Sequence, residues 1–443
     1  MGEGERTSKK GREQWTSNLG FIFAAIGSAV GIGNIWRFPY IVGTNGGGAF
    51  LLIYVIVLFT FGLAFMILEL AVGRYYQTSI LSAFEKIRKR FKWFALVTVG
   101  TTFAILSYYL VILGWVLFYF LTWITTGTAL PFDEYINSSY PIISFFGILA
   151  INFVIVLLGI QRGIETLSKL GVMLLIAIMI PMTLFGLSLE GSQKGLAFYL
   201  TPDFSTLADP KSWSAAFGQA FFSLSVGMGV LLVYGSYLKQ DRSILTSSIY
   251  IIMADLAIAF MAGLMIFSFA FANNLEPNQG TTLVFQVMPT IFSGMENYGS
   301  IVGSLFFCLL LLAGITSSIS MFQVPVSTLE DTFNFGRTKA TAIIASLLSI
   351  SGLLPALSYS SFSANIGDIA FFDLYDLVFG TYGIAISGAI FSVIATWFFD
   401  RTKLLEQVNL KSPLKVPSGV LIIVKFLMPS LIVATVLSQI IGF

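Results

Sequence analysis

Residues 28–34 read Ser28-Ala-Val-Gly-Ile-Gly-Asn34, and residues 223–229 read Ser223-Leu-Ser-Val-Gly-Met-Gly229. Each stretch interrupts a long apolar run, and both contain the tetrad Val-Gly-x-Gly. Glycines two residues apart lie on different faces of a helix, which favours local unwinding. We therefore predict that two helices are broken here. The alternative, in which the glycines only let neighbouring helices approach closely, stays open.

The chain around these stretches is too apolar for a soluble protein. Of its 443 residues, 56% are hydrophobic and 10% are charged, whereas a soluble domain has about 25% charged residues. This composition excludes soluble, disordered and nucleic-acid-binding classes and predicts an integral membrane protein. The chain has no histidine, which excludes His-ligated metals and Ser-His catalysis. We expect no enzymatic activity and no organic cofactor, and we interpret Cys308 as a small buried hydrophobe.

A bilayer crossing needs about 20 mostly apolar residues. The fold class predicted from the apolar runs is all-α, with eleven transmembrane helices. These are expected at residues 15–43, 48–72, 93–127, 139–160, 164–188, 213–238, 244–272, 298–331, 338–356, 372–400 and 418–441.

The distribution of basic residues predicts how the helices are oriented. Most of the 24 Lys and Arg residues fall in the N-terminal segment and in alternate loops. Because cytoplasmic loops are rich in these residues, we expect a cytoplasmic N-terminus and an outer C-terminus in the cell inner (plasma) membrane. The polar start of the chain is not typical of a signal peptide. Arg37 and Lys425 are basic residues within predicted spans.

The repeated tetrad divides the chain into two five-helix halves. Because five is odd, the second half is inverted relative to the first, and the broken helices 1 and 6 mark a binding site near the bilayer midplane. The predicted organisation is a cytoplasmic N-terminal segment at 1–13, a first repeat at 14–188, an extracellular loop at 189–212, a second repeat at 213–400, a cytoplasmic loop at 401–417, and an eleventh helix with the C-terminus at 418–443.

Unwound backbone inside a membrane leaves amides and carbonyls that need partners, since each lone group costs several kcal/mol. The half-helix after Gly33 directs its amides at an anion, and the carbonyls near Ala29, Phe222 and Ser223 suit a cation. A zwitterion fits both.

Glu69, Asp255 and Asp376 interrupt the predicted spans 2, 7 and 10, and Arg37 interrupts span 1. Such charges are usually paired or functional. We interpret Asp255 as functional and Glu69 as a structural cap for the amides of an unwound neighbour. The run Ala313-Gly-Ile-Thr-Ser-Ser318 offers hydroxyl ligands for a small hard cation, although such hydroxyls often bond only to their own helix.

Several further motifs accompany these features. They are Trp15, Gly27-x-Ala29-Val30-Gly31-x-Gly33-Asn34-x-Trp-Arg37-Phe38-Pro39, Asn45-Gly-Gly-Gly-Ala-Phe50, Glu69-x-x-x-Gly73-Arg74, Tyr108-Tyr109, Gly218-Gln-x-Phe-Phe222 and Ala313-Gly-x-Thr-Ser-Ser318. Together they resemble the signatures of the neurotransmitter:sodium symporter family, particularly its bacterial amino acid transporters.

The resemblance implies two sodium sites and one substrate site. The first sodium site would use the Ala29 carbonyl, Asn34, Ser223, Asp255 and the substrate carboxylate. The second would use the carbonyls of Gly27, Val30 and Ala313 and the hydroxyls of Thr316 and Ser317. The substrate carboxylate would meet Ile32, Gly33 and Tyr109, and its ammonium the carbonyls of Ala29, Phe222 and Ser223. The side-chain walls would be Ile105, Tyr109, Phe222, Ser225, Met228, Ser317 and Met321.

The resemblance also implies two gates. Arg37 and Asp376 would form the extracellular gate beneath a lid that includes Phe222. The cytoplasmic gate would form from Arg12 and Asp331, supported by Trp15, Ser236, Tyr237 and Gln323.

Some residues depart from the family pattern or select within it. Position 255 is an acid where many relatives have Asn, and we therefore do not expect this chain to bind chloride. The positions that resemble the chloride site of chloride-dependent relatives are Tyr54, Gln219, Ser223, Asp255 and Ala259. Position 223 is Ser rather than Thr, and we expect eleven spans instead of twelve. Gly171 and Pro181 resemble a motif for cytoplasmic opening; a simple kink is the alternative.

The predicted function is sodium-coupled import of neutral hydrophobic or aromatic L-amino acids by alternating access. A proton-coupled transporter of the same fold, with Asp255 or Glu69 titrating, and a non-transporting amino acid receptor are the alternatives. The expected partners are the amino acid and the lipid bilayer, with no nucleic acid, and the oligomeric state stays open.

Overall fold

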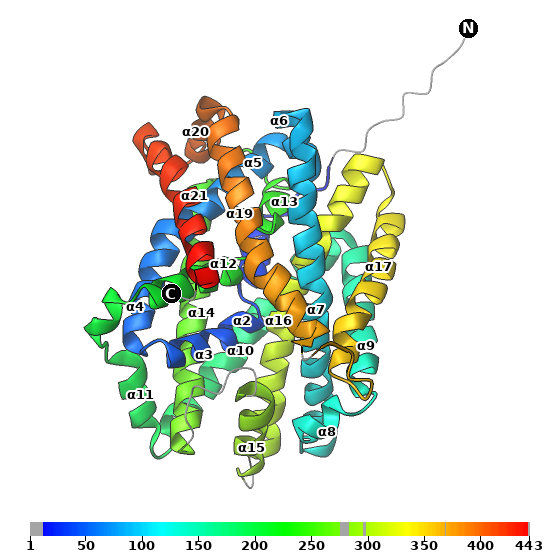
Figure 1. Cartoon of the computed structure of the whole chain (residues 1–443), viewed down its shortest axis with the longest axis vertical. Helices are drawn as coiled ribbons and strands as arrows, with labels where there is room; N and C mark the ends of the chain where they lie inside the picture. The colour runs from blue at the N-terminus through cyan, green and yellow to red at the C-terminus, as the bar shows by residue number, and fades with distance from the viewer. Residues whose placement is uncertain (1–11, 275–282, 296–297, 368, 442–443) are drawn as a thin grey trace.

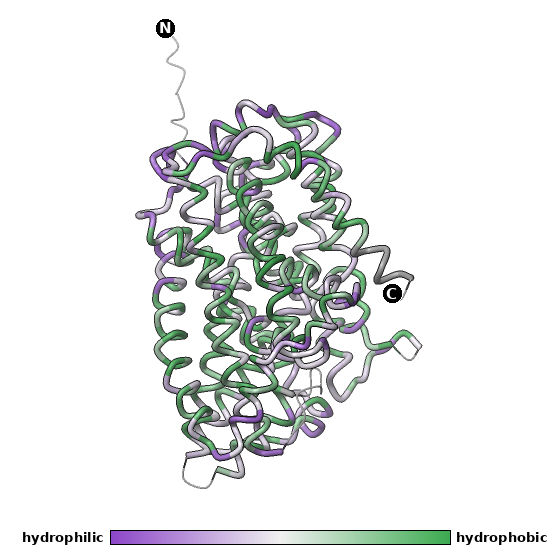
Figure 2. Tube along the Cα trace, turned by 90° about the vertical axis from the view of Figure 1, so that its left-hand side faces the viewer, coloured by the Kyte–Doolittle hydropathy of each residue, from purple (hydrophilic) through white to green (hydrophobic). Residues whose placement is uncertain are grey.

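The structure is a computed structural model that describes residues 12–274, 283–295, 298–367 and 369–441. Nearly all of the predicted N-terminal segment 1–13 lies outside these residues, as do residues 442–443 of the predicted C-terminal part. The protein is a bundle of long helices (Figure 1). Apolar residues predominate along them, and hydrophilic residues gather towards the ends of the bundle (Figure 2).

The first half of the chain contains ten α-helices and three tighter or wider helical turns, labelled η. They are α1 (Asn18–Ala29), α2 (Ile32–Ile35), α3 (Arg37–Thr44), α4 (Gly48–Val57), η1 (Leu58–Gly62), α5 (Leu63–Tyr76), α6 (Ile80–Ile87), η2 (Lys89–Phe91), α7 (Lys92–Thr126), α8 (Phe132–Ile136), α9 (Tyr140–Leu157), η3 (Ile160–Glu165) and α10 (Thr166–Ser188).

The second half adds a short hairpin, in which β1 (Asn365–Ile366) pairs antiparallel with β2 (Ile369–Ala370). Its helices are α11 (Ser192–Leu200), η4 (Phe204–Ala208), α12 (Pro210–Ser223), α13 (Val230–Gly235), α14 (Ile244–Ala272), η5 (Leu283–Val287), α15 (Met288–Ser293), α16 (Gly299–Phe333), α17 (Arg337–Ser358), α18 (Phe371–Tyr375), η6 (Asp376–Gly383), α19 (Ile384–Val393), η7 (Ile394–Phe398), α20 (Arg401–Asn409) and α21 (Ser418–Ile441).

The predicted membrane architecture is observed. Among the described residues, eight helices are long and apolar enough to cross a bilayer, and the bent pair of α1 with α2 and α3 adds a ninth. The interrupted pair α12 and α13 and the apolar helix α21 occupy the predicted sixth and eleventh spans. This arrangement is consistent with eleven crossings.

Both predicted helix breaks are confirmed. The chain leaves α1 at Val30, passes through extended backbone at Gly31 and restarts at Ile32, with a bend of 58° between the two halves. In the second break, Ser225 and Gly227 have left-handed backbone, with φ of 52° and 80°. Serine rarely adopts this conformation, because its Cβ crowds the backbone.

The two breaks are tied to each other and to α5. The Ser225 hydroxyl donates to the Ser28 carbonyl at 2.9 Å, which joins the second break to the end of α1. The buried Glu69 of α5 accepts a hydrogen bond from the Gly227 amide at 3.1 Å. This contact matches the capping role expected for Glu69, and it satisfies one amide that unwinding releases.

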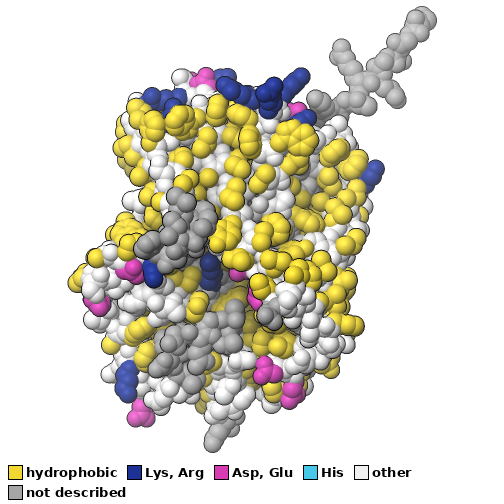
Figure 3. All heavy atoms as spheres, viewed as in Figure 1, with side chains coloured by type: hydrophobic (Ala, Val, Ile, Leu, Met, Phe, Trp, Pro, Cys, Tyr) yellow, Lys and Arg dark blue, Asp and Glu magenta, His cyan; other side chains and the backbone are white. Residues whose placement is uncertain are grey.

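Lys and Arg side chains gather at the end of the molecule where α6 and α20 lie (Figures 1 and 3). We call this the basic end. Arg12 lies here too, because its partner Asp331 accepts from the amide of Ser79, the residue before α6.

Candidate functional site

A small cavity lies where the two helix breaks face α7 and α16. Its volume of about 20 Å³ is room for roughly one water molecule. None of the lining side chains is charged. They are Ala29, Gly31, Gly33, Asn34, Ile105, Tyr109, Phe222, Ser223, Ser225, Met228, Ser317 and Met321.

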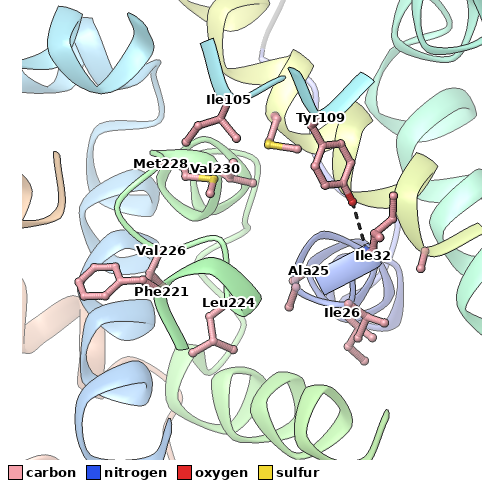
Figure 4. Packing of buried hydrophobic residues seen from close by; sticks show 14 of the residues in the cluster. Ala25, Ile26, Ile32, Ile105, Tyr109, Phe221, Leu224, Val226, Met228 and Val230 are labelled. Atoms are coloured by element: carbon pink, nitrogen blue, oxygen red, sulfur yellow. Dashed lines mark hydrogen bonds between the residues drawn. The ribbon is translucent and has the colours of Figure 1, made fainter. Parts of the chain in front are cut away.

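All of the residues predicted to bind substrate line this cavity except Ile32. Ile105 projects from α7 towards Met228 of the second break, and Tyr109 projects from the same helix towards Ile32 of the first (Figure 4). The Ile32 side chain lines a second, larger cavity instead, but its amide donates to the Tyr109 hydroxyl at 3.2 Å (Figure 4). A backbone amide and a hydroxyl therefore converge at one edge of the small cavity, as recognition of a carboxylate requires.

Gly31 and Gly33 let this backbone approach its neighbours closely. A Cβ added at Gly33 would lie 2.7 Å from the Phe222 ring, and one added at Gly31 would lie 2.8 Å from the Ser317 hydroxyl. Both distances are shorter than van der Waals contact. Gly31 was not among the predicted site residues, although the glycine repeat that predicted the break contains it.

Three neutral polar side chains surround the carboxylate of Asp255, which is fully buried on α14. The Asn34 amide nitrogen donates to Asp255 at 2.7 Å and to the Ser223 hydroxyl at 3.0 Å. Ser223 donates to both carboxylate oxygens, at 2.8 and 3.0 Å, and the Tyr54 hydroxyl lies 3.5 Å away. Within the described ranges, no group of three or more His, Cys, Asp or Glu comes together. Amide, hydroxyl and carboxylate oxygens suit a hard cation such as sodium.

The residues predicted for the second ion site meet between α1 and α16. The Ser317 hydroxyl donates to the carbonyls of Ser28 at 2.9 Å and Gly27 at 3.4 Å. The Thr316 hydroxyl donates to the Ala313 and Leu312 carbonyls, both at 3.0 Å, so it bonds to its own helix here. Val30 lies at the end of α1, where its amide donates to the Ile26 carbonyl at 2.7 Å. Sequence reasoning did not include Ser28, whose carbonyl accepts from both Ser317 and Ser225.

The larger cavity, of about 430 Å³, lies beyond Phe222 and contains the predicted extracellular gate. Arg37 and Asp376 both line it without forming an ion pair; the Arg37 guanidinium lies 4.9 Å from the centre of the Phe222 ring. Gly33, Tyr109 and Phe222 line both cavities, so the two cavities adjoin each other here. The gate is therefore unpaired on this side.

The residues of the predicted cytoplasmic gate meet at the basic end. Arg12 forms an ion pair with Asp331 at 2.6 Å, donates to Ser236 at 2.9 Å and lies 4.7 Å from the centre of the Tyr237 ring. Burial lowers the pKa of Arg12, but Tyr237 and Asp331 raise it by more, so its pKa lies above the ordinary value and the group stays charged.

The residues predicted to support Arg12 meet at the same place. The buried Trp15 donates through its indole nitrogen to the Tyr234 carbonyl at 3.0 Å, and Gln323 donates to the Tyr237 hydroxyl at 2.9 Å. The basic end is therefore closed where the opposite end is open.

Further polar contacts at this end were not predicted. Arg337 donates to Gln323 at 2.7 Å, and the Thr16 amide donates to Glu165 at 2.9 Å. The Ile160 amide donates to Glu13 at 2.9 Å. These are ordinary polar residues near helix ends, and only the folded chain brings them together.

Comparisons with known proteins support the family resemblance seen in the sequence motifs. The model of the sodium:neurotransmitter symporter family matches residues 12–140 and 139–443. A sodium-dependent transporter of Methanocaldococcus jannaschii is 35% identical over 429 residues, which cover 91% of this chain and 85% of the relative. The sodium-dependent transporter YhdH of Bacillus subtilis is 32% identical, over 89% of this chain and 90% of the relative.

A solved structure has the same fold. The crystal structure of MhsT in complex with L-phenylalanine is 36% identical to this chain and has a TM-score of 0.88. The match covers 97% of this chain and all of MhsT.

Proposed function

The chain belongs to the sodium:neurotransmitter symporter family of sodium-dependent transporters, and from that premise we propose that it imports a neutral hydrophobic or aromatic L-amino acid together with sodium. Asn34 and Ser223 carry this proposal, because each lines the small cavity and also contacts Asp255. Sodium at Asp255 and an amino acid in the cavity would share these two side chains. Binding of one then favours binding of the other.

The cavity supports a neutral substrate. Its lining combines neutral hydroxyl, amide and backbone groups with the apolar side chains of Ile105, Met228 and Met321. A charged substrate side chain would lose its water without gaining a partner of opposite charge. The L-phenylalanine with which MhsT was crystallised belongs to the proposed substrate class.

Substrate entry requires the small cavity to widen. Phe222 is half-buried between the two cavities, and rotation of its ring would join them. The unbranched side chains of Met228 and Met321 can adapt to substrates of different shape.

The proposal includes alternating access across a plasma membrane with the basic end in the cytoplasm. The positive-inside rule supports this orientation. The open larger cavity would then face outward, and the closed network of Arg12 and Asp331 would face inward. Two sodium ions per cycle, one at Asp255 and one near Ser317, are part of the proposal.

The test is uptake into proteoliposomes. Radiolabelled leucine or phenylalanine should accumulate with an inward sodium gradient and should not accumulate when choline replaces sodium. Unlabelled lysine and glutamate should not compete. Uptake driven by a proton gradient without sodium would instead favour the proton-coupled alternative. Sodium-dependent binding without uptake would favour a receptor.

A further inference from the structure

Lys425 is the only charged residue in the sequence of α21, and it is absent from the ion and substrate sites described above. It lies half-buried, with its ammonium nitrogen 4.3 Å from the centre of the Trp397 ring and 5.8 Å from that of Phe426. The Trp397 indole nitrogen donates to the Lys425 carbonyl at 3.1 Å, which fixes the two helices to each other here. A charge within a membrane helix is costly and by default indicates function.

Lys425 opens into a cavity of about 240 Å³ between η7, α20 and α21. Its charged lining residues are Lys425 and Arg401, and its apolar wall includes Trp397, Phe399, Ile422 and Phe426. Arg401 donates to the Ser418 carbonyl at 2.5 Å, which leaves its other guanidinium donors for a ligand.

Neither cation is neutralised by a carboxylate in the part of the chain that the structure describes, since neither takes part in an ion pair there. The acid next to Arg401 in the sequence, Asp400, instead caps α20 by accepting from the amides of Thr402 and Lys403 at 2.8 and 3.1 Å. Two positive charges therefore line one cavity without a negative partner.

The cavity lies near the basic end, because Arg401 of its lining is the first residue of α20 (Figure 1). Lys425 is seven residues beyond Ser418, about 10 Å along the helix axis from the start of α21, and a lysine side chain can extend from such a position towards the headgroup layer. Trp397 is 49% exposed and Phe426 is 55% exposed. Exposed aromatic side chains beside basic residues are typical of a membrane interface.

We propose that this cavity binds the headgroup of an anionic phospholipid, with its phosphate between Arg401 and Lys425 and an acyl chain along Ile422 and Phe426. Arginine offers paired donors that match two phosphate oxygens, and lysine adds a compact charge. A zwitterionic headgroup would bring an ammonium group next to two existing cations. The site therefore prefers phosphatidylglycerol to phosphatidylethanolamine.

Native mass spectrometry of the delipidated full chain, titrated with each of these two lipids, tests the proposal. Arg401→Gln and Lys425→Gln should each weaken phosphatidylglycerol binding about fivefold, which corresponds to ~1 kcal/mol for one basic residue near the membrane surface. The double variant should lose the preference for phosphatidylglycerol, and Lys425→Arg should keep it. Lys403→Gln is the matched control, because Lys403 lies on α20 but outside the cavity, 5.5 Å from the centre of the Tyr75 ring.

Equal retention of the two lipids by the unmodified chain would overturn the proposal, as would a double variant that still prefers phosphatidylglycerol. If the substitutions changed the mass of an oligomer and left lipid retention unaltered, the surface would be a contact between copies of the chain and the proposal would be wrong. Each variant is first checked for an unchanged melting temperature. If the double variant does not fold, the two single variants decide.

Discussion

Asp255 is a single residue whose surroundings define what it can do. Its carboxylate is fully buried, and its contacts are with the neutral side chains of Asn34, Ser223 and Tyr54. Hydrogen bonds alone compensate only partly for the lost hydration of a buried charge. A sodium ion would compensate for it more fully, and we therefore expect ion binding to depend on this carboxylate.

Asp255→Asn should weaken sodium binding about ten- to a hundredfold, because interactions of a buried charged group are worth ~1.5–3 kcal/mol. The sodium concentration that gives half of the maximal rise in melting temperature measures the change. Asp373→Asn serves as the control, since Asp373 lines the larger cavity and not the small one. Normal sodium affinity in Asp255→Asn would show that another group binds the ion.

The same carboxylate predicts how transport responds to chloride. Replacing chloride by gluconate should leave uptake by the unmodified protein unchanged, because the fixed charge of Asp255 takes the place of an anion. In Asp255→Asn, residual uptake should increase with chloride. Gln219 is buried, and its amide has no hydrogen-bond partner in the described residues, so it offers a donor to such an anion. Strong chloride dependence of the unmodified protein would contradict this assignment.

At the scale of one element, α10 is a continuous helix that contains Pro181. Gly171 of the same helix faces the second proposed ion site, since an added Cβ would lie 3.0 Å from the Thr316 methyl carbon. The sequence identified this pair of residues but could not distinguish a kink from a segment that unwinds.

Gly171→Ala combined with Pro181→Ala should slow sodium release severalfold, if local unwinding of α10 lets water reach Thr316 and Ser317. Proline in a helix interior costs about 3 kcal/mol relative to alanine, so the double variant stiffens the helix. Stopped-flow measurement of sodium release is the readout. Pro181→Ala alone separates this stiffening from the contact that an added methyl group at position 171 makes with Thr316, and Pro429→Ala in α21 is the control. Unaltered release would favour the kink.

The elements were predictable to different degrees. The long spans and both breaks followed from apolar runs and glycine spacing. The short helices α6, α8, α11, α15 and α20 were not predicted, because they are too short for a clear periodic signal. Their packing against the long helices comes from tertiary structure. The contacts of Glu165 and Arg337 were missed because they join residues that lie far apart in the sequence and meet only in the folded chain.

At the scale of the whole molecule, one end is open and the other is closed. The larger cavity separates Arg37 from Asp376, whereas Arg12 and Asp331 are paired at the basic end. The gate role of these residues stays a prediction, but the structure places the two predicted pairs apart and pairs only one of them. The sequence could not predict which pair would be closed, because the alternating access that we propose requires one sequence to support both states.

Substitutions in the two predicted gates should shift the equilibrium between the outward-open and inward-open states in opposite directions. The substitution Ile112→Cys, made in a Cys308→Ser variant, introduces a thiol whose rate of labelling reports access to the larger cavity. With sodium and substrate present, Asp376→Ala should keep it reactive towards an aqueous thiol reagent. Arg12→Ala should slow the reaction about tenfold or more, since it removes a charged contact worth ~1.5–3 kcal/mol from the closed end.

The control for Arg12→Ala is Arg162→Ala, which removes an exposed cation near the same end. Turnover should fall in Asp376→Ala more than substrate binding does. Identical labelling in the gate variants and the unmodified protein would mean that these pairs do not set the conformational balance.

The close approach at Gly31 and Gly33 also limits which sequences can perform this function. Neither residue has a left-handed backbone, so alanine would be acceptable there on conformational grounds alone. An added Cβ would instead have to displace the Ser317 hydroxyl or the Phe222 ring, both of which line the small cavity. In a saturation mutagenesis library selected for uptake, both positions should therefore tolerate glycine alone, whereas Gly100 and Gly218, where an added Cβ meets no neighbour within 4 Å, should accept other small residues.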